Sequence, residues 1–157
     1  MQTILRTIFI SLTLSLAQLA HSFAGPYEDG IEAAKRGDHE TALQIFRSLA
    51  EKGNPKGQTG VGRMYHQGWG VPQDYAEAAK WYRKAAEQGY PGAQNNLGVM
   101  YGKGQGVPQD IVKATEWYRR AAEQGYAIAQ DNLGDRYRLG DSVPKGTSSP
   151  FRANWLA

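Results

Sequence analysis

The strongest constraint on the fold of this chain is a block of sequence that repeats after 36 residues. Three motifs recur in the same order: Val-Pro-Gln-Asp at 71–74 and 107–110, Trp-Tyr-Arg at 81–83 and 117–119, and Ala-Ala-Glu-Gln-Gly-Tyr at 85–90 and 121–126. A period of this length indicates supersecondary units that bury their apolar faces only against neighbouring units. Such proteins usually work by presenting a surface. The repeat therefore favours a binding or scaffolding role, but it does not identify the ligand.

Each full repeat predicts two antiparallel helices joined by a turn. In the second repeat, the first helix is expected over 91–103 and the second over 110–124. Asp110 is a favourable N-cap, and Gly125 can adopt the left-handed conformation that ends many helices. The first repeat carries the same signals. Its Asp-Tyr-Ala-Glu at 74–77 matches the capping box, in which two side chains and two backbone amides pair reciprocally.

Apolar side chains three or four positions apart predict one buried stripe on the second helix of each repeat. This spacing makes Trp81 and Trp117 core residues rather than ligand-stacking residues. Gly62, Gly98 and Gly134 recur in the middle of the first helices, where glycine costs about 1 kcal/mol relative to alanine. We therefore expect a neighbouring helix to approach these glycines closely. The stripe residues are Tyr75, Ala78, Trp81, Tyr82 and Ala85, then Ile111, Ala114, Trp117, Tyr118 and Ala121.

Residues 1–24 have the pattern of a secretory signal. Arg6 precedes a mostly apolar stretch at 7–20, and Ser-Phe-Ala at 22–24 offers small residues where a signal peptidase cuts. The alternative is a retained membrane helix, but the stretch is shorter than the roughly 20 apolar residues that span a bilayer. We expect cleavage after Ala24 and a periplasmic or secreted protein with no membrane span.

The remaining chain is expected to divide into helix pairs followed by an irregular end. The Pro and Gly-Ser-Thr residues at 144–150 preclude a long helix there, so the last first-helix lacks its mate. Apolar surface near Leu133 and Tyr137 should then be exposed, or covered by the tail or a partner. A shortened natural protein and a truncated gene would look alike here. The expected segments are a cap pair at 25–53, repeats at 54–89 and 90–125, a partial repeat at 126–144 and a tail at 145–157.

Composition excludes several classes of function. The chain has 18 Lys and Arg against 15 Asp and Glu, and this mild excess predicts no nucleic-acid partner. It has no cysteine, so neither a disulfide nor a lipid on an N-terminal cysteine is possible. Its histidines, at 21, 39 and 66, lack metal-ligand spacing. We expect no metal and no cofactor.

Catalytic patterns are weak. Ser142 and Lys145 match the S-x-x-K signature of penicillin-recognising enzymes. Both replace turn residues of the repeat, whereas that chemistry needs them on one helical turn. We therefore expect no enzymatic activity. A binder or hydrolase of cell-wall fragments or β-lactams is kept as the alternative, and a degenerate, poorly folded remnant as a third possibility.

The residues from Ala93 to Ala122 resemble the Sel-one-like repeat family, a relative of the tetratricopeptide repeats. They follow its pattern A-x-x-x-L-G-x-x-Y-x-x-G-x-G-V-x-x-D-x-x-x-A-x-x-W-Y-x-x-A-A. The resemblance implies an all-α fold, a short right-handed α-solenoid of about seven helices in stacked antiparallel pairs. It also implies an adaptor, which in bacteria often regulates envelope polymer synthesis, signalling or host contact. The cysteine-rich branch linked to penicillins is not matched, because this chain lacks its cysteines.

Positions that vary between repeats are the candidates for recognition. One face of the first helices changes freely, and in stacked pairs these helices line the concave wall, so we expect a polar groove for a protein or peptide partner. The alternative is a solvated face without a role in binding. Trp69 is a large aromatic residue on a variable turn, which makes it a contact candidate. The predicted partner-binding residues are Arg63, Trp69, Asn95, Lys103 and Asp135.

Overall fold

The computed structural model describes residues 25–138, which contain seven helices and no strand. The predicted all-α class and the number of helices are therefore confirmed. The predicted signal at 1–24 and the tail at 145–157 lie outside the described residues. The helices are α2 (Pro26–Lys35), α3 (His39–Glu51), α4 (Pro55–Gln67), α5 (Tyr75–Glu87), α6 (Pro91–Lys103), α7 (Ile111–Glu123) and α8 (Ala127–Arg138).

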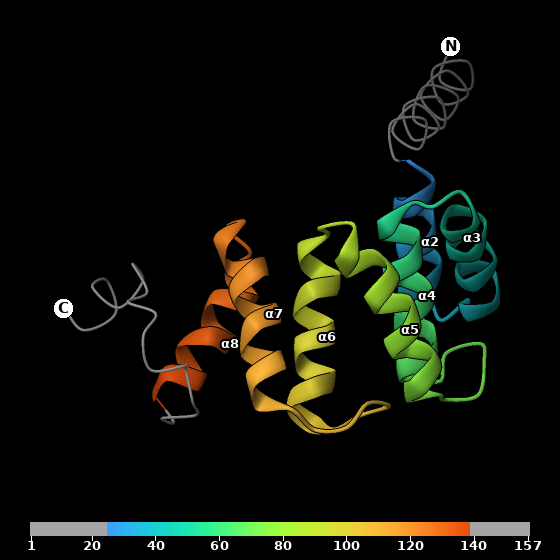
Figure 1. The fold of residues 1–157 in the computed structure, drawn as a ribbon. Coiled ribbons are helices and arrows are strands. Elements are labelled where there is room, and N and C mark those ends of the chain that lie inside the picture. The colour runs from blue at the N-terminus through green and yellow to red at the C-terminus, as the bar shows by residue number, and fades with distance from the viewer. Residues whose placement is uncertain (1–24, 139–157) are drawn as a thin grey trace, which may run out of the picture.

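The helices stand in a row of antiparallel pairs, from α2 and α3 at one end to α8 at the other (Figure 1). We call α2, α4, α6 and α8 the first helices of the pairs, and α3, α5 and α7 the second helices. Almost all the packing joins helices that are consecutive in sequence, and α4 additionally touches α6. This nearest-neighbour packing is the architecture that a 36-residue repeat predicts.

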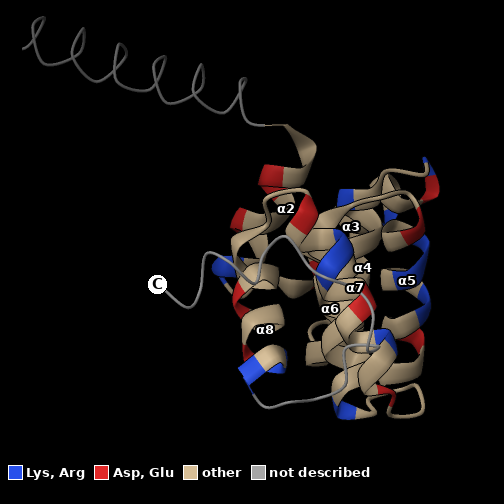
Figure 2. Cartoon of the chain, turned by 60° about the vertical axis from the view of Figure 1, so that its left-hand side comes forward, with Lys and Arg blue, Asp and Glu red and all other residues tan. Residues whose placement is uncertain are grey.

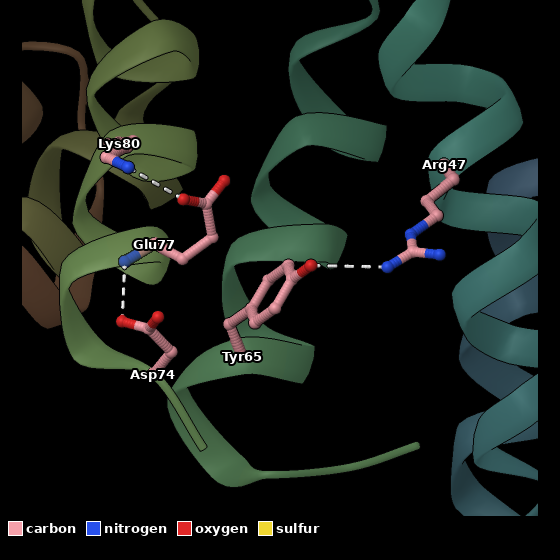
Figure 3. Close-up of polar contacts among 5 residues, drawn as sticks. All are labelled: Arg47, Tyr65, Asp74, Glu77 and Lys80. Atoms are coloured by element: carbon pink, nitrogen blue, oxygen red, sulfur yellow. Dashed lines mark hydrogen bonds and ion pairs between the residues drawn. The ribbon is translucent and has the colours of Figure 1, made fainter. Parts of the chain in front are cut away.

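The helix boundaries follow from the predicted signals. The Asp110 carboxylate accepts a hydrogen bond from the backbone N–H of Lys113 at 3.0 Å, and Gly125 has φ +80°. The capping box is only half formed in the first repeat (Figure 3). Asp74 accepts from the Glu77 N–H at 2.9 Å, but the Asp74 N–H donates to a backbone carbonyl. The Glu77 carboxylate pairs instead with Lys80 at 2.9 Å.

Two of the three recurring glycines lie where a tyrosine ring packs on the backbone. A Cβ on Gly62 would lie 2.8 Å from the Tyr82 ring, and a Cβ on Gly98 would lie 2.7 Å from the Tyr118 ring. The expectation of close helix approach is confirmed at both. It is wrong at Gly134, where a Cβ would meet no described residue within 4 Å. Gly134 lies on α8, the last described helix, and no second helix follows it within residues 25–138 to bring a ring against it.

The tryptophans of the repeat lie at the edge of the core rather than inside it. Trp81 and Trp117 are half-buried against the apolar clusters of the preceding pairs, whereas Tyr82 is buried. A cation three residues later covers each indole: Lys84 at 4.4 Å and Arg120 at 4.6 Å from the ring centroid. The prediction of core tryptophans is therefore correct only in part, because each indole packs on the core and is also covered by an exposed cation.

Polar side chains join neighbouring pairs at repeated positions. Arg47 donates to the Tyr65 hydroxyl at 3.2 Å (Figure 3), and the pair 36 residues later, Arg83 and Tyr101, does so at 3.1 Å. Charged residues of both signs are interspersed along the helices (Figure 2). At the end of the described chain, Leu133 is buried in the cluster formed by α7 and α8, while Ile128 on α8 is exposed. Within 25–138, no helix is both long and apolar enough to cross a membrane.

Candidate interaction groove

An open groove of about 420 Å³ runs across the first helices α2, α4 and α6. We call it the central groove. The repeat explains its position, since the second helices cover one side of the stack and the first helices are left to form the other. Its floor is closed by core side chains, among them Phe46 and Met64. The residues at its rim that matter below are Tyr27, Arg63, Trp69, Tyr90, Asn96 and Tyr126.

Three tyrosines from different places along the stack give the central groove an aromatic wall. Tyr27 belongs to α2, while Tyr90 and Tyr126 occupy the same position in the turns before α6 and α8. Partial burial raises the pKa of Tyr27 and of Tyr90 above the ordinary value of 10.0. These hydroxyls are therefore neutral at physiological pH, and the rings present half-buried apolar surface with a polar edge.

Trp69 is held at the rim by stacking. Its indole lies parallel to the His39 ring, with the ring centroids 5.0 Å apart and the planes at 7°. The glycines on either side, Gly68 and Gly70, both have positive φ, which fixes the turn that carries the indole. A Cβ on Gly70 would lie 2.9 Å from the His39 carbonyl oxygen, so this turn packs tightly on the start of α3. Trp69 is thus a pre-positioned aromatic side chain rather than a mobile loop residue.

Arg63 supplies positive charge to the same place. Its guanidinium lies 5.3 Å from the centroid of the Trp69 ring. Arg63 and Lys35 line the central groove, and no Asp or Glu does. Lys35 is paired with Glu32 at 2.8 Å, whereas Arg63 forms no ion pair with any described residue. The positive charge of Arg63 also acts on Tyr82: burial raises the pKa of the Tyr82 hydroxyl, and Arg63 lowers it to a smaller extent.

The structure brings together two of the five predicted residues, Arg63 and Trp69. Lys103 is exposed at the end of α6 and does not line the central groove. Asp135 is exposed on α8, where it pairs with Arg138. Asn95 is not on an exposed face, and this expectation is wrong. It is 5% exposed, and its carbonyl accepts a hydrogen bond from the Asn132 amide at 2.8 Å.

The groove residue that the sequence reading missed is Asn96. It lies one position after Asn95 and three before Val99, and both Asn96 and Val99 line the central groove. Arg63 and Val99 are equivalent positions 36 residues apart that differ between repeats, and Asn96 shares their helix face because it lies three positions before Val99. Tyr90 and Tyr126 were missed because they belong to a repeated motif and therefore looked purely architectural.

The described residues offer no metal centre, since no group of three or more His, Asp or Glu in 25–138 could hold a metal ion. Ser142 and Lys145, the residues of the weak catalytic match, lie outside the described part of the chain. The central groove is surrounded by a cation on an aromatic ring, by phenol hydroxyls and by one side-chain amide.

Stacked antiparallel helix pairs in a row define an α-solenoid. The family model described as Sel1 repeat matches four segments, at 15–54, 55–90, 91–126 and 127–154. The chain therefore belongs to the Sel1 repeat family, as the resemblance in sequence predicts. Repeats of this family generally serve as protein–protein interaction scaffolds, and its members are typically non-enzymatic adaptors.

Solved structures agree with this assignment. The chain is 40% identical to a Sel1 repeat protein from Oxalobacter formigenes, with a TM-score of 0.66, covering 71% of this chain and 46% of that one. It is 41% identical to a protective antigen present in uropathogenic Escherichia coli strains, which displays the same type of repeat fold, with a TM-score of 0.66 and coverage of 80% and 28%.

The chain thus spans less than half the length of these two proteins. Helicobacter pylori cysteine-rich protein B shares the fold alone, at 20% identity and a TM-score of 0.56, with coverage of 68% of this chain and 96% of that one. No curated protein matches the chain.

Proposed function

We propose that the protein is an exported adaptor of the bacterial envelope that binds a protein or peptide partner in the central groove. The observation that carries the proposal is the pairing of Arg63 with Trp69 at the rim of an open groove. The signal-like sequence at 1–24 supports export, to the periplasm or beyond. Membership of a family of interaction scaffolds supports the choice of a protein partner.

The size of the groove favours a partner that inserts side chains. A volume of about 420 Å³ is in the range of sites that enclose a small ligand, and it would hold a few side chains of an extended segment. Tryptophan, tyrosine and arginine are the residue types that most often dominate binding energy at protein interfaces. All three types gather at this rim, and stacking on His39 keeps Trp69 in place without a partner.

Two further residues are proposed as peripheral contacts. Lys103 and Asp135 are exposed on α6 and α8, which are first helices like those that line the groove. Exposed charges at the edge of an interface usually change the association rate more than the affinity. Asn95 is not proposed, because it is buried in a hydrogen bond between α6 and α8.

The test is capture of partners from an envelope extract by the protein and by an Arg63→Ala/Trp69→Ala variant. We expect the variant to lose captured proteins that the unaltered protein retains. The matched control is Trp117→Ala/Arg120→Ala, which removes the same kind of cation–indole pair from α7, away from the groove. Arg63→Ala alone serves as a second variant, since the side chain is exposed and its removal should leave the melting curve unchanged.

The outcome that contradicts the proposal is equal capture by all the variants. Loss of capture by the α7 control together with the groove variant would also contradict it, because the effect would then come from the stability of the stack rather than from the groove. Circular dichroism melting of each variant separates these cases.

A further inference from the structure

We infer that the central groove selects an extended peptide segment in which a carboxylate lies beside a bulky apolar side chain. The carboxylate binds the Arg63 guanidinium, and the apolar side chain packs on the tyrosine wall. This inference rests on the proposed function, since it names the chemistry of the partner that the same groove would take.

The charge of the groove carries the first step. Two cations beside Arg63 have carboxylate partners: Lys35, which lines the groove, pairs with Glu32 at 2.8 Å, and Lys56, which lies over the Tyr27 ring, pairs with Glu28 at 3.9 Å. Arg63 has no such partner among the described residues, and no acidic side chain lines the groove. One positive charge is therefore uncompensated at this place. A planar guanidinium matches a carboxylate through two parallel hydrogen bonds, which makes a carboxylate the complementary group.

The cation is also pre-positioned. The contact of Arg63 with the Trp69 ring at 5.3 Å restricts a side chain that would otherwise be free on an exposed helix face. The indole is itself fixed by its parallel stacking on His39. A group that is ordered before binding loses less conformational entropy on binding, so the same contact contributes more to affinity.

A hydrogen-bonding group for the peptide backbone lies on the facing helix. Asn96 on α6 is half-buried in the lining, and its amide makes no hydrogen bond to any described residue. A side-chain amide both donates and accepts, which is what one peptide unit of an extended chain requires. The tyrosines at 90 and 126 and Val99 then form the surface on which an apolar side chain would pack.

A nucleic acid fits this groove less well than a peptide. Binding of a polyanion depends on several Lys or Arg contacts to successive phosphates. The groove offers a single uncompensated cation, and the charges on the rest of the helices are mixed in sign (Figure 2). The tyrosine wall alone could stack bases, so an oligonucleotide belongs in the test as a competing ligand.

The experiment is fluorescence polarisation of the full chain with four short labelled peptides that differ only at two central residues: Asp-Phe, Asn-Phe, Lys-Phe and Asp-Ser. We expect Asp-Phe to bind about tenfold more tightly than Asn-Phe or Asp-Ser, as a desolvated charged hydrogen bond and a buried aromatic side chain would each produce. In Arg63→Glu the preference should reverse towards Lys-Phe. The control Arg120→Glu, on α7, should keep the original order.

Three results would overturn the inference. The first is equal binding of the Asp-Phe and Asn-Phe peptides, and the second is tighter binding of a single-stranded oligonucleotide than of the Asp-Phe peptide. The third is tighter binding of a peptide with the sequence of residues 145–157 than of the Asp-Phe peptide, which would assign the groove to the chain's own tail. Equal binding of Asp-Phe and Asn-Phe that still depends on Arg63 and Trp69 leaves the proposed function intact. Failure of all four peptides to bind also rejects the inference, and the capture experiment then decides the proposed function separately.

Discussion

A single methyl group at Gly98 should measure how tightly the helices of one pair approach each other. In Gly98→Ala the new Cβ would lie 2.7 Å from one carbon of the Tyr118 ring and 3.1 Å from the Ala114 carbonyl oxygen. Tyr118 is buried, so its ring cannot move into solvent to make room. The carbonyl belongs to the backbone of α7, so it can yield only if the helix shifts.

The magnitude follows from two opposing effects. Replacing a mid-helix glycine by alanine stabilises a helix by about 1 kcal/mol. Overpacking a well-filled interior costs about 1–3 kcal/mol. Gly134→Ala is the matched control, since it makes the same change at the equivalent position of α8, where the Cβ meets no described residue within 4 Å. The free energy of unfolding should therefore be lower for Gly98→Ala than for Gly134→Ala by about 1–3 kcal/mol.

Urea unfolding followed by far-ultraviolet circular dichroism gives this difference. Gly134→Ala should raise the midpoint and Gly98→Ala should lower it relative to Gly134→Ala. Equal midpoints for the two variants would refute the reasoning, because the Tyr118 ring would then not be the reason why position 98 requires a glycine. A Tyr118→Leu background should remove part of the Gly98→Ala cost but not all of it, since the Ala114 carbonyl remains.

Three further predictions follow from single contacts. Asn54→Ala removes the side chain that accepts from two N–H groups at the start of α4, and it should cost about 1 kcal/mol of unfolding free energy while Asn54→Asp costs less. Asn95→Ala leaves the Asn132 amide without its acceptor, so it should lower stability by about 1–2 kcal/mol without changing peptide binding. Burial raises the pKa of Tyr82 above 10.0 in the folded protein, so the unfolded chain loses this proton first as the pH rises. Stability should thus be unaffected by this group below about pH 10 and fall above it, and Tyr82→Phe should unfold at higher pH.

Each of these has a plain contrary result. Asn54→Asp and Asn54→Ala of equal stability would show that the cap contributes nothing. Loss of peptide binding in Asn95→Ala, with a normal melting curve, would show that the buried residue reaches the partner after all. Alkaline unfolding of Tyr82→Phe at the same pH as the unaltered protein would assign the transition to other tyrosines.

The helices could be predicted from sequence because their signals are local. Pro91 and the glycine after Lys103 enclose α6, and the predicted range 91–103 is the observed one. The orientation of each first helix was harder to predict. These helices pack on both sides, against their own partner and against the neighbouring pairs, so only a narrow strip is open. Polar residues also occupy buried positions, among them Gln94 and Asn95. A polar residue on these helices therefore does not indicate which face is exposed.

The groove itself could be predicted only in part. Arg63 and Trp69 were found because they vary between repeats, which is a property of the sequence. Their contact depends on the turn that places the indole within 5.3 Å of the guanidinium, and no spacing rule gives that distance. Asn95 and Asn96 are adjacent asparagines, and composition alone does not tell which of them faces the groove. Adjacent residues differ by about 100° around a helix, so Asn95 is buried in a hydrogen bond while Asn96 lines the groove.

Packing between consecutive helices has a consequence for how such a protein can grow. Each pair offers a docking side that the next pair is already shaped to fit, so duplicating one unit would add a pair without redesigning the rest. Segments 71–90 and 107–126 are identical at 14 of 20 positions, as a duplication followed by substitution would leave them. Every added unit would lengthen the surface formed by the first helices by one helix, which carries its own variable positions. New specificity could then arise by copying and editing, while Arg63 and Trp69 stay as they are.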